Sequence, residues 1–260
     1  MSDERIARTG GSEELPESLR QIRERTPARL LEGRAGAGYR TRTQLELREA
    51  HAAARDAVWT ELDVAAAFGD EFVRRWNLFE VQTAAKSKDE YLLRPDLGRQ
   101  FDEASRALIR ERCAASCDLQ IGIGDGLSAT AVAAQVPGLL PLLVSASEQR
   151  GWRIGQPFVI HHCRVGILNE IGELLRPAVA VLLIGERPGL ATAESLSAYL
   201  AYRPAKLQTD ANRNLVSNIH ARGLSAELAA EQIVGLAREM MAQSMSGHAL
   251  RTPELPHLKG

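Results

Sequence analysis

From residue 96 onward, apolar segments of two different periods alternate along the chain. Short apolar runs at residues 119–123, 158–160 and 178–184 predict buried strands, and the last, AVAVLLI, is apolar on both faces, as a central parallel strand is. Apolar residues at helical spacing predict helices over residues 101–115 and 166–175. Successive strand–helix units predict an α/β fold: a doubly wound, mainly parallel sheet.

The remaining segments of this region complete the predicted sheet and its cover. A helical stretch follows the first strand to about residue 149, and we expect Pro137 to interrupt it. Residues 195–202, SLSAYLAY, alternate small and large side chains, which favours a fourth strand over a helix. A long final helix is predicted from a Ser225 cap to about residue 243.

The first 98 residues follow another pattern. Residues 1–24 have no sustained apolar period, which predicts a mobile N-terminal arm. Residues 25–98 form a small helical N-terminal region, in which residues 44–62 carry an apolar stripe that includes Leu45 and Trp59. Residues 91–96 are expected to be extended before they turn into the next helix, because Pro95 disfavours helix at the residue before it. The α/β domain then spans residues 99–260.

Composition narrows the class of protein. The chain has 260 residues, 45% hydrophobic and 25% charged, with a net charge of −1, which argues against a general binder of nucleic acid. Its three cysteines cannot close a disulfide framework, and residues 178–184, the longest apolar run, are too short to cross a bilayer. We therefore expect a cytoplasmic protein that binds neither nucleic acid nor membrane.

Three polar loops leave the predicted strands at their carboxyl ends, over residues 124–128, 161–165 and 185–189, and the first and third contain glycines. Ligands of open α/β sheets bind where such loops converge, and glycine lets a backbone approach closely. The loops predict a site for a small molecule or cofactor, and the alternative is that their glycines only make turns. A stand-alone α/β enzyme using these loops is one function that this pattern allows.

Other chemistries have weaker signals. Ser128 follows a strand, but its G-L-S-A-T segment lacks the second glycine of a nucleophile elbow. Cys113 and Cys117 could join His161 or His162 on zinc, but a lone CxxxC is more typical of two half-buried thiols. The glycines at residues 122–126 have the wrong spacing for a dinucleotide or phosphate loop. We predict no catalytic residue and no metal ligand in this chain.

Long segments of the sequence resemble one enzyme family. These are RVGILNEIGELLRPAVAVLLIGERPGLATAESLSAYLAYRP and DANRNLVSNIHARGL, preceded in order by GRAGAGYRTRTQLELREAHAAARDAV, YLLRPDLGRQ and DLQIGIGDGLSATAV. Together they make the chain similar to the small subunit of ethanolamine ammonia-lyase over roughly residues 26–250.

This resemblance implies a function. Small subunits of the family pair with a large TIM-barrel subunit in a hetero-oligomer that converts ethanolamine to acetaldehyde and ammonia. Ethanolamine is bound mainly by the large subunit. Adenosylcobalamin lies between the two subunits, so residues 99–260 would be the cobalamin-contacting domain. The family's contacts correspond to Val165, Glu186 and Leu215 of this sequence.

Two points about this implied site stay open in the sequence. No D-x-H-x-x-G segment exists to place a histidine on cobalt, which agrees with a family whose cofactor keeps its own base there. Glu186 could instead cap a helix or pair with Arg187. The sequence also leaves open whether the complex is free in the cytoplasm or enclosed in a bacterial microcompartment.

Overall fold

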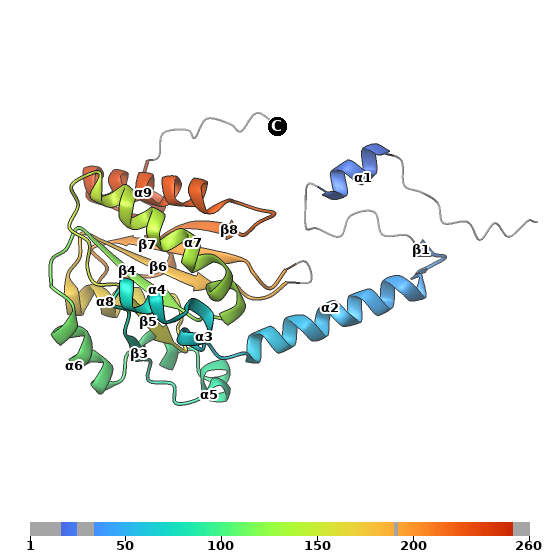
Figure 1. Cartoon of the computed structure of the whole chain (residues 1–260), viewed down its shortest axis with the longest axis horizontal. Coiled ribbons are helices and arrows are strands. Elements are labelled where there is room, and N and C mark those ends of the chain that lie inside the picture. The colour runs from blue at the N-terminus through green and yellow to red at the C-terminus, as the bar shows by residue number, and fades with distance from the viewer. Residues whose placement is uncertain (1–16, 25–33, 190–191, 252–260) are drawn as a thin grey trace, which may run out of the picture.

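A six-stranded sheet organises the chain (Figure 1). The structure is a computed structural model that describes residues 17–24, 34–189 and 192–251. The strands are β3 (Glu80–Gln82), β4 (Leu119–Gly124), β5 (Phe158–His161), β6 (Val179–Gly185), β7 (Leu196–Tyr202) and β8 (Asn214–Ile219). Their order is β3-β5-β4-β6-β7-β8; the first four run parallel, and β7 is antiparallel to both of its neighbours. This confirms the α/β fold with a mainly parallel sheet.

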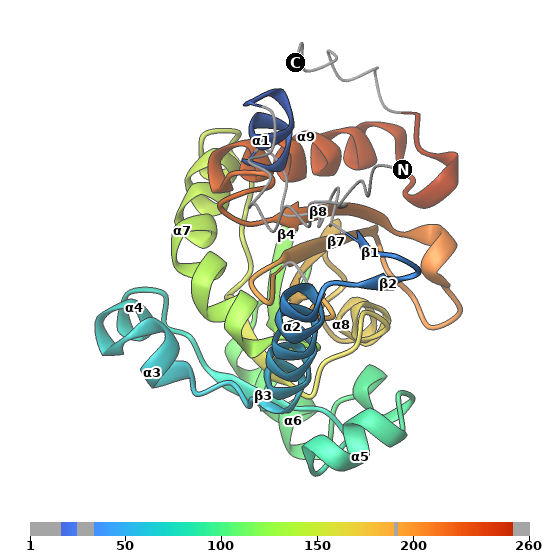
Figure 2. The same ribbon diagram turned by 90° about the vertical axis from the view of Figure 1, so that its right-hand side faces the viewer.

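Helices cover both faces of the sheet, as Figures 1 and 2 show. On one face α7 (Ala129–Glu148) and α9 (Ala226–Gln243) pack against the strands, and on the other lie α6 (Glu103–Arg112) and α8 (Ile167–Leu175). Every residue of β4 and β6 is buried, because these central strands meet helices on both sides. The doubly wound arrangement predicted from the sequence is thereby confirmed.

Two predicted details of this domain have clear outcomes. Residues 196–202 of the SLSAYLAY segment form β7, and Ser225 caps the start of α9, since its Oγ accepts from the Leu228 N–H. Pro137, however, does not interrupt α7, which continues through both Pro137 and Pro141. This helix packs against both the sheet and the neighbouring α9, and such packing outweighs the backbone hydrogen bonds that the prolines remove. Although α7 is long and apolar enough to span a membrane, its buried residues belong to this core.

The prediction that residues 91–96 are extended is wrong over its first half. Residues 91–93 belong to α5 (Lys88–Leu93), which Ser87 caps by accepting a hydrogen bond from the Glu90 N–H. The cap and the acidic residues of the first turn start the helix. Pro95 ends it, since the preceding Arg94 has left the helical region of backbone space.

The N-terminal part contains more than helices. It comprises the elements α1 (Glu17–Glu24), β1 (Arg34–Ala35), β2 (Gly38–Tyr39), α2 (Thr41–Trp59), α3 (Val64–Phe68) and α4 (Asp70–Arg75). Short 3-10 turns occur farther along at Leu97–Arg99, Asp210–Asn212 and Gly247–Ala249. The arm predicted over residues 1–24 lies outside the described residues, except for α1.

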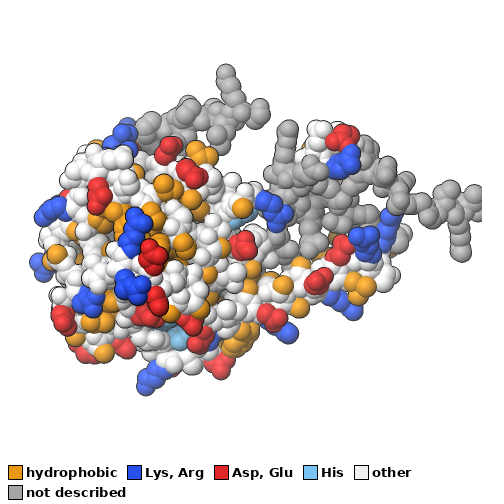
Figure 3. Space-filling model, in the orientation of Figure 1, with side chains coloured by type: hydrophobic (Ala, Val, Ile, Leu, Met, Phe, Trp, Pro, Cys, Tyr) orange, Lys and Arg blue, Asp and Glu red, His pale blue; other side chains and the backbone are white. Residues whose placement is uncertain are grey.

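The α2 helix extends away from the domain (Figure 1). Leu45 and Trp59 of its apolar stripe remain exposed, at 58% and 49% of their surface. In the space-filling view, hydrophobic side chains lie among charged ones along this helix (Figure 3). The stripe that the sequence pattern showed therefore does not pack against the core of the described chain.

Two strands of the main sheet were not visible in the sequence pattern. The three-residue β3 lies within the region expected to be helical, and it adds an edge strand to the sheet beside β5. The β8 strand forms the opposite edge beside β7. The main sheet therefore includes a strand that precedes residue 99.

The loops after β4 and β6 touch each other through their backbones, as their glycines suggested. The Leu127 N–H donates to the Gly185 carbonyl at 3.1 Å. Gly126 has a φ of +58°, and a Cβ atom on it would lie 2.4 Å from the same carbonyl oxygen. Glycine is required here both for the positive φ and for the close approach.

Replacing Gly126 with alanine should therefore destabilise the fold twice over. Strain at positive φ and overpacking against Gly185 together are expected to cost roughly 2–4 kcal/mol, measured as a lower urea midpoint at unchanged m-value. Gly151→Ala is the matched control, because Gly151 has a φ of +73° and a Cβ atom on it would meet nothing within 4 Å. That control should lose about 1 kcal/mol, and equal losses in the two variants would show that the contact with Gly185 contributes nothing.

Candidate functional site

A hollow of about 430 Å³ lies beside the carboxyl ends of β4, β5 and β6 and extends over one face of β7 and β8. It is lined by Tyr91, Gly126, Leu127, Cys163, Arg164, Val165, Ile184, Gly185, Glu186, Arg187, Ser197, Tyr199, Leu215 and Ser217. All three loops predicted to converge contribute to this lining. The structure also brings Val165, Glu186 and Leu215 together in it, although they are far apart in the sequence.

The floor of the hollow is the face of β7 and β8 that the helices leave open. Tyr199 and Leu215 are register partners across these strands, and Leu215 is 46% exposed. Ser217 is two residues farther along β8, so its side chain lies on the same face as Leu215. The result is an apolar surface with a polar margin, open to a ligand or to another chain.

The Glu186 carboxylate joins three strands. Its Oε1 accepts from the Ser197 Oγ at 2.6 Å and from the Asn218 N–H at 3.0 Å, and its Oε2 accepts from the Ser195 Oγ at 2.8 Å. Among the described residues it neither caps a helix nor pairs with Arg187, so both readings that the sequence left open are excluded. A carboxylate has about four acceptor positions, and one of these remains for a ligand in the hollow.

A single buried carboxylate fixes the loop that carries Val165. Asp125 accepts from the backbone N–H groups of His162, at 2.9 Å, and Cys163, at 2.8 Å. His162 has a φ of +57°, and the Tyr91 hydroxyl donates to the Cys163 carbonyl at 2.9 Å. Because these contacts satisfy successive backbone groups, the loop is held in one conformation and presents Val165 to the hollow.

Lys88 supplies the counter-charge of this carboxylate. Its Nζ lies 3.9 Å from the Asp125 Oδ2, and the two side chains are 6% and 2% exposed. Burial lowers the pKa of Lys88, an effect that the negative charge of Asp125 opposes. Within the described residues the Nζ has no hydrogen-bond partner, so charge attraction between two buried side chains holds the pair.

The weaker chemical candidates have structural roles instead. Ser128 is the buried N-cap of α7: its Oγ accepts from the Ala131 N–H at 3.1 Å and donates to the Ala193 carbonyl at 2.5 Å. Cys113, Cys117 and Cys163 are free and buried, and burial raises the pKa of the Cys113 thiol to about 12. The described part of the chain holds no group of three His, Cys, Asp or Glu that could bind a metal ion.

Sequence reasoning did not find Lys88, Tyr91 or the role of Asp125. The sequence did contain a signal for Asp125. An aspartate between two glycines directly after a buried strand favours hydrogen bonds from its carboxylate to nearby backbone N–H groups. Lys88 and Tyr91 had none, since they reach the loop from α5, which was expected to be extended at Tyr91.

The buried pair makes a testable energetic prediction. Asp125→Asn leaves the Lys88 ammonium buried without a counter-charge and should cost roughly 3–5 kcal/mol in urea unfolding. Lys88→Met should also destabilise, since it leaves the carboxylate unpaired. The double variant should lose less than the two single losses combined, by roughly 1–3 kcal/mol. Strictly additive losses would show that the two charges do not stabilise each other.

Comparison with known proteins identifies the family. A sequence model of the ethanolamine ammonia-lyase light chain (EutC) matches residues 16–251. The ethanolamine ammonia-lyase small subunit of Clostridium acetobutylicum is 41% identical over 235 residues, which is 90% of this chain and 95% of that protein. Those of Clostridium perfringens and Listeria monocytogenes are 40% and 38% identical, again over 90% of this chain, and are covered over 78% of their length. The matches confirm the resemblance seen in the motifs, and the chain belongs to the ethanolamine ammonia-lyase light-chain family.

Proposed function

We propose that this chain is the small subunit of an adenosylcobalamin-dependent ethanolamine ammonia-lyase, and that it covers the cofactor at the interface with a large catalytic subunit. The complex would convert ethanolamine to acetaldehyde and ammonia. One observation carries the proposal beyond the family: Val165, Glu186 and Leu215, the positions that the resemblance assigns to the cofactor, line a single hollow.

The chemistry of the hollow suits a corrinoid. A corrin ring has apolar surface and carries amide side chains at its edge, whose N–H groups seek acceptors. Val165, Ile184 and Leu215 offer apolar contacts, and Glu186 offers the remaining acceptor position of its fixed carboxylate. The hollow is open and smaller than the cofactor, so this chain covers one side and a second subunit must cover the other.

The residues of this chain would bind and shield rather than react. When bound, adenosylcobalamin supplies the radical through its cobalt–carbon bond. Glu186 orients the corrin edge through a carboxylate already fixed by three donors, while Val165 and Leu215 exclude water from the covered side. Ethanolamine and the radical-handling residues are assigned to the large subunit. Three free thiols suit a reducing compartment, so the cytoplasm stays the predicted location.

The proposal predicts that the chain depends on its partner. Purified alone and supplied with adenosylcobalamin, it should release no ammonia from ethanolamine. Mixing with the large subunit of an ethanolamine ammonia-lyase should produce turnover, followed as ammonia release, together with co-elution of the two chains. Turnover by the isolated chain would contradict the proposal and favour a stand-alone α/β enzyme.

Glu186 provides the residue-level test in the reconstituted complex. Glu186→Gln keeps the shape but weakens the acceptor, so the apparent KM for the cofactor should rise about tenfold before kcat at saturation falls. Glu186→Ala should raise this KM further while still co-purifying with the large subunit. Glu231→Gln, on the exposed side of α9, is the matched control and should change neither value. An unchanged cofactor KM in both Glu186 variants would mean that this carboxylate only joins the strands.

A further inference from the structure

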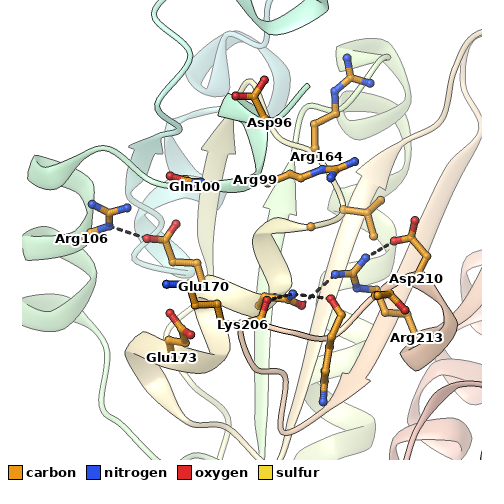
Figure 4. A pocket seen from close by; sticks show the side chains of 15 residues that line it. Asp96, Arg99, Gln100, Arg106, Arg164, Glu170, Glu173, Lys206, Asp210 and Arg213 are labelled. Carbon is orange, nitrogen blue, oxygen red and sulfur yellow. Dashed lines mark hydrogen bonds and ion pairs between the residues drawn. The ribbon is translucent and has the colours of Figure 1, made fainter. Parts of the chain in front are cut away.

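A second hollow, of about 730 Å³, continues from the first along the flank of α8 (Figure 4). Arg164 and Val165 line both hollows, so the two are contiguous at the loop that Asp125 fixes. The second hollow differs in character, since most of the side chains around it are charged. A ligand seated in the first hollow can therefore extend into the second only with a polar or charged group.

Part of this charge is neutralised within the chain. Arg106 donates to Glu170 at 2.5 Å, and Arg213 pairs with Asp210. Asp96 is likewise held by a neighbouring arginine, Arg94, through two nitrogens. These acidic groups are therefore already occupied by basic ones.

The remaining charges leave an excess of cations. Arg99, Arg164 and Lys206 form no ion pair with an acidic side chain among the described residues, and Glu173 is the one lining acid without a basic partner there. Arg164 instead places its guanidinium over the Tyr91 ring, 4.2 Å from the centroid. Three cations thus face one anion, which favours a ligand that carries negative charge.

Of these three cations, Arg99 is the one whose position best suits binding of a negatively charged ligand. Its side chain lies across Gly166, where a Cβ atom would come within 2.8 Å of its Cγ and Cδ, so packing orients an otherwise exposed arginine. Figure 4 shows its guanidinium between Arg164 and Arg213. Arg213 itself is 5% exposed and already paired with Asp210, so Arg99 and Arg164 are the guanidinium groups left for a ligand.

We propose that Arg99 and Arg164 form an anion site that binds the phosphodiester of the same cobalamin whose corrin meets Glu186. This inference rests on the proposed function. The amides at the corrin edge are neutral, so the phosphodiester in the nucleotide tail is the one anionic group of the cofactor. Guanidinium groups bind phosphate oxygens through paired, charge-assisted hydrogen bonds. The site lies next to the corrin hollow, where the tail of a bound cobalamin would pass.

The test is an equilibrium titration of the complex with the large subunit, followed by corrinoid absorption rather than by turnover. Three corrinoids separate the contribution of the phosphate to affinity from that of the corrin ring. They are adenosylcobalamin, adenosylcobinamide phosphate, and adenosylcobinamide, which lacks the phosphate. Arg99→Met should weaken the first two about tenfold and leave adenosylcobinamide unchanged. Arg99→Lys should retain most of the affinity, and Arg238→Met, an exposed arginine on α9, is the control that should change none.

Each other outcome has a definite meaning. Equal loss of all three corrinoids would overturn the proposal and make Arg99 a packing residue over Gly166. Unchanged affinities would overturn it as well. Weaker association of the two subunits without any corrinoid would show instead that Arg99 meets an acidic side chain of the large subunit. Failure of the wild-type complex to bind any of the three corrinoids would contradict the proposed function itself.

Discussion

The site depends on one buried carboxylate. Asp125 directly follows the central strand β4, and its carboxylate binds the backbone of the loop after β5, so two segments that are separate in sequence are held together. The contact between Gly126 and Gly185 extends the same constraint to the third loop. Val165 and Glu186 therefore face one hollow because backbone groups, rather than long side chains, hold the loops together.

The sequence predicted the centre of the fold better than its margins. Strands buried on both faces, such as β4 and β6, have continuous apolar sequences, and this pattern is typical of central parallel strands. The edge strands have no such apolar run: β3 has three residues, and β8 buries only Val216 and Ile219 of its six residues. The α5 helix was not predicted, because Pro95 disfavours helix only at its end. Its start is defined by the cap at Ser87.

The site was predictable in position but not in detail. Strand-end loops and family motifs pointed to Val165, Glu186 and Leu215, and these do lie around one hollow. The three hydrogen bonds to Glu186 could not be foreseen, since Ser195, Ser197 and Asn218 reach it only through the pairing of β6, β7 and β8. Likewise Lys88 is near Asp125 only because α5 packs beneath the loop after β5.

The order of the sheet also bears on how the chain folds. The β3 strand pairs with β5 across about eighty residues of sequence and forms that edge of the sheet. Contacts of such long range form slowly, so the edge of β5 would stay open until late in folding. That edge consists of Phe158, Val159 and Ile160, all fully buried in the native fold. The short β3 thus serves as a cover for a strand that would otherwise pair with other chains and aggregate.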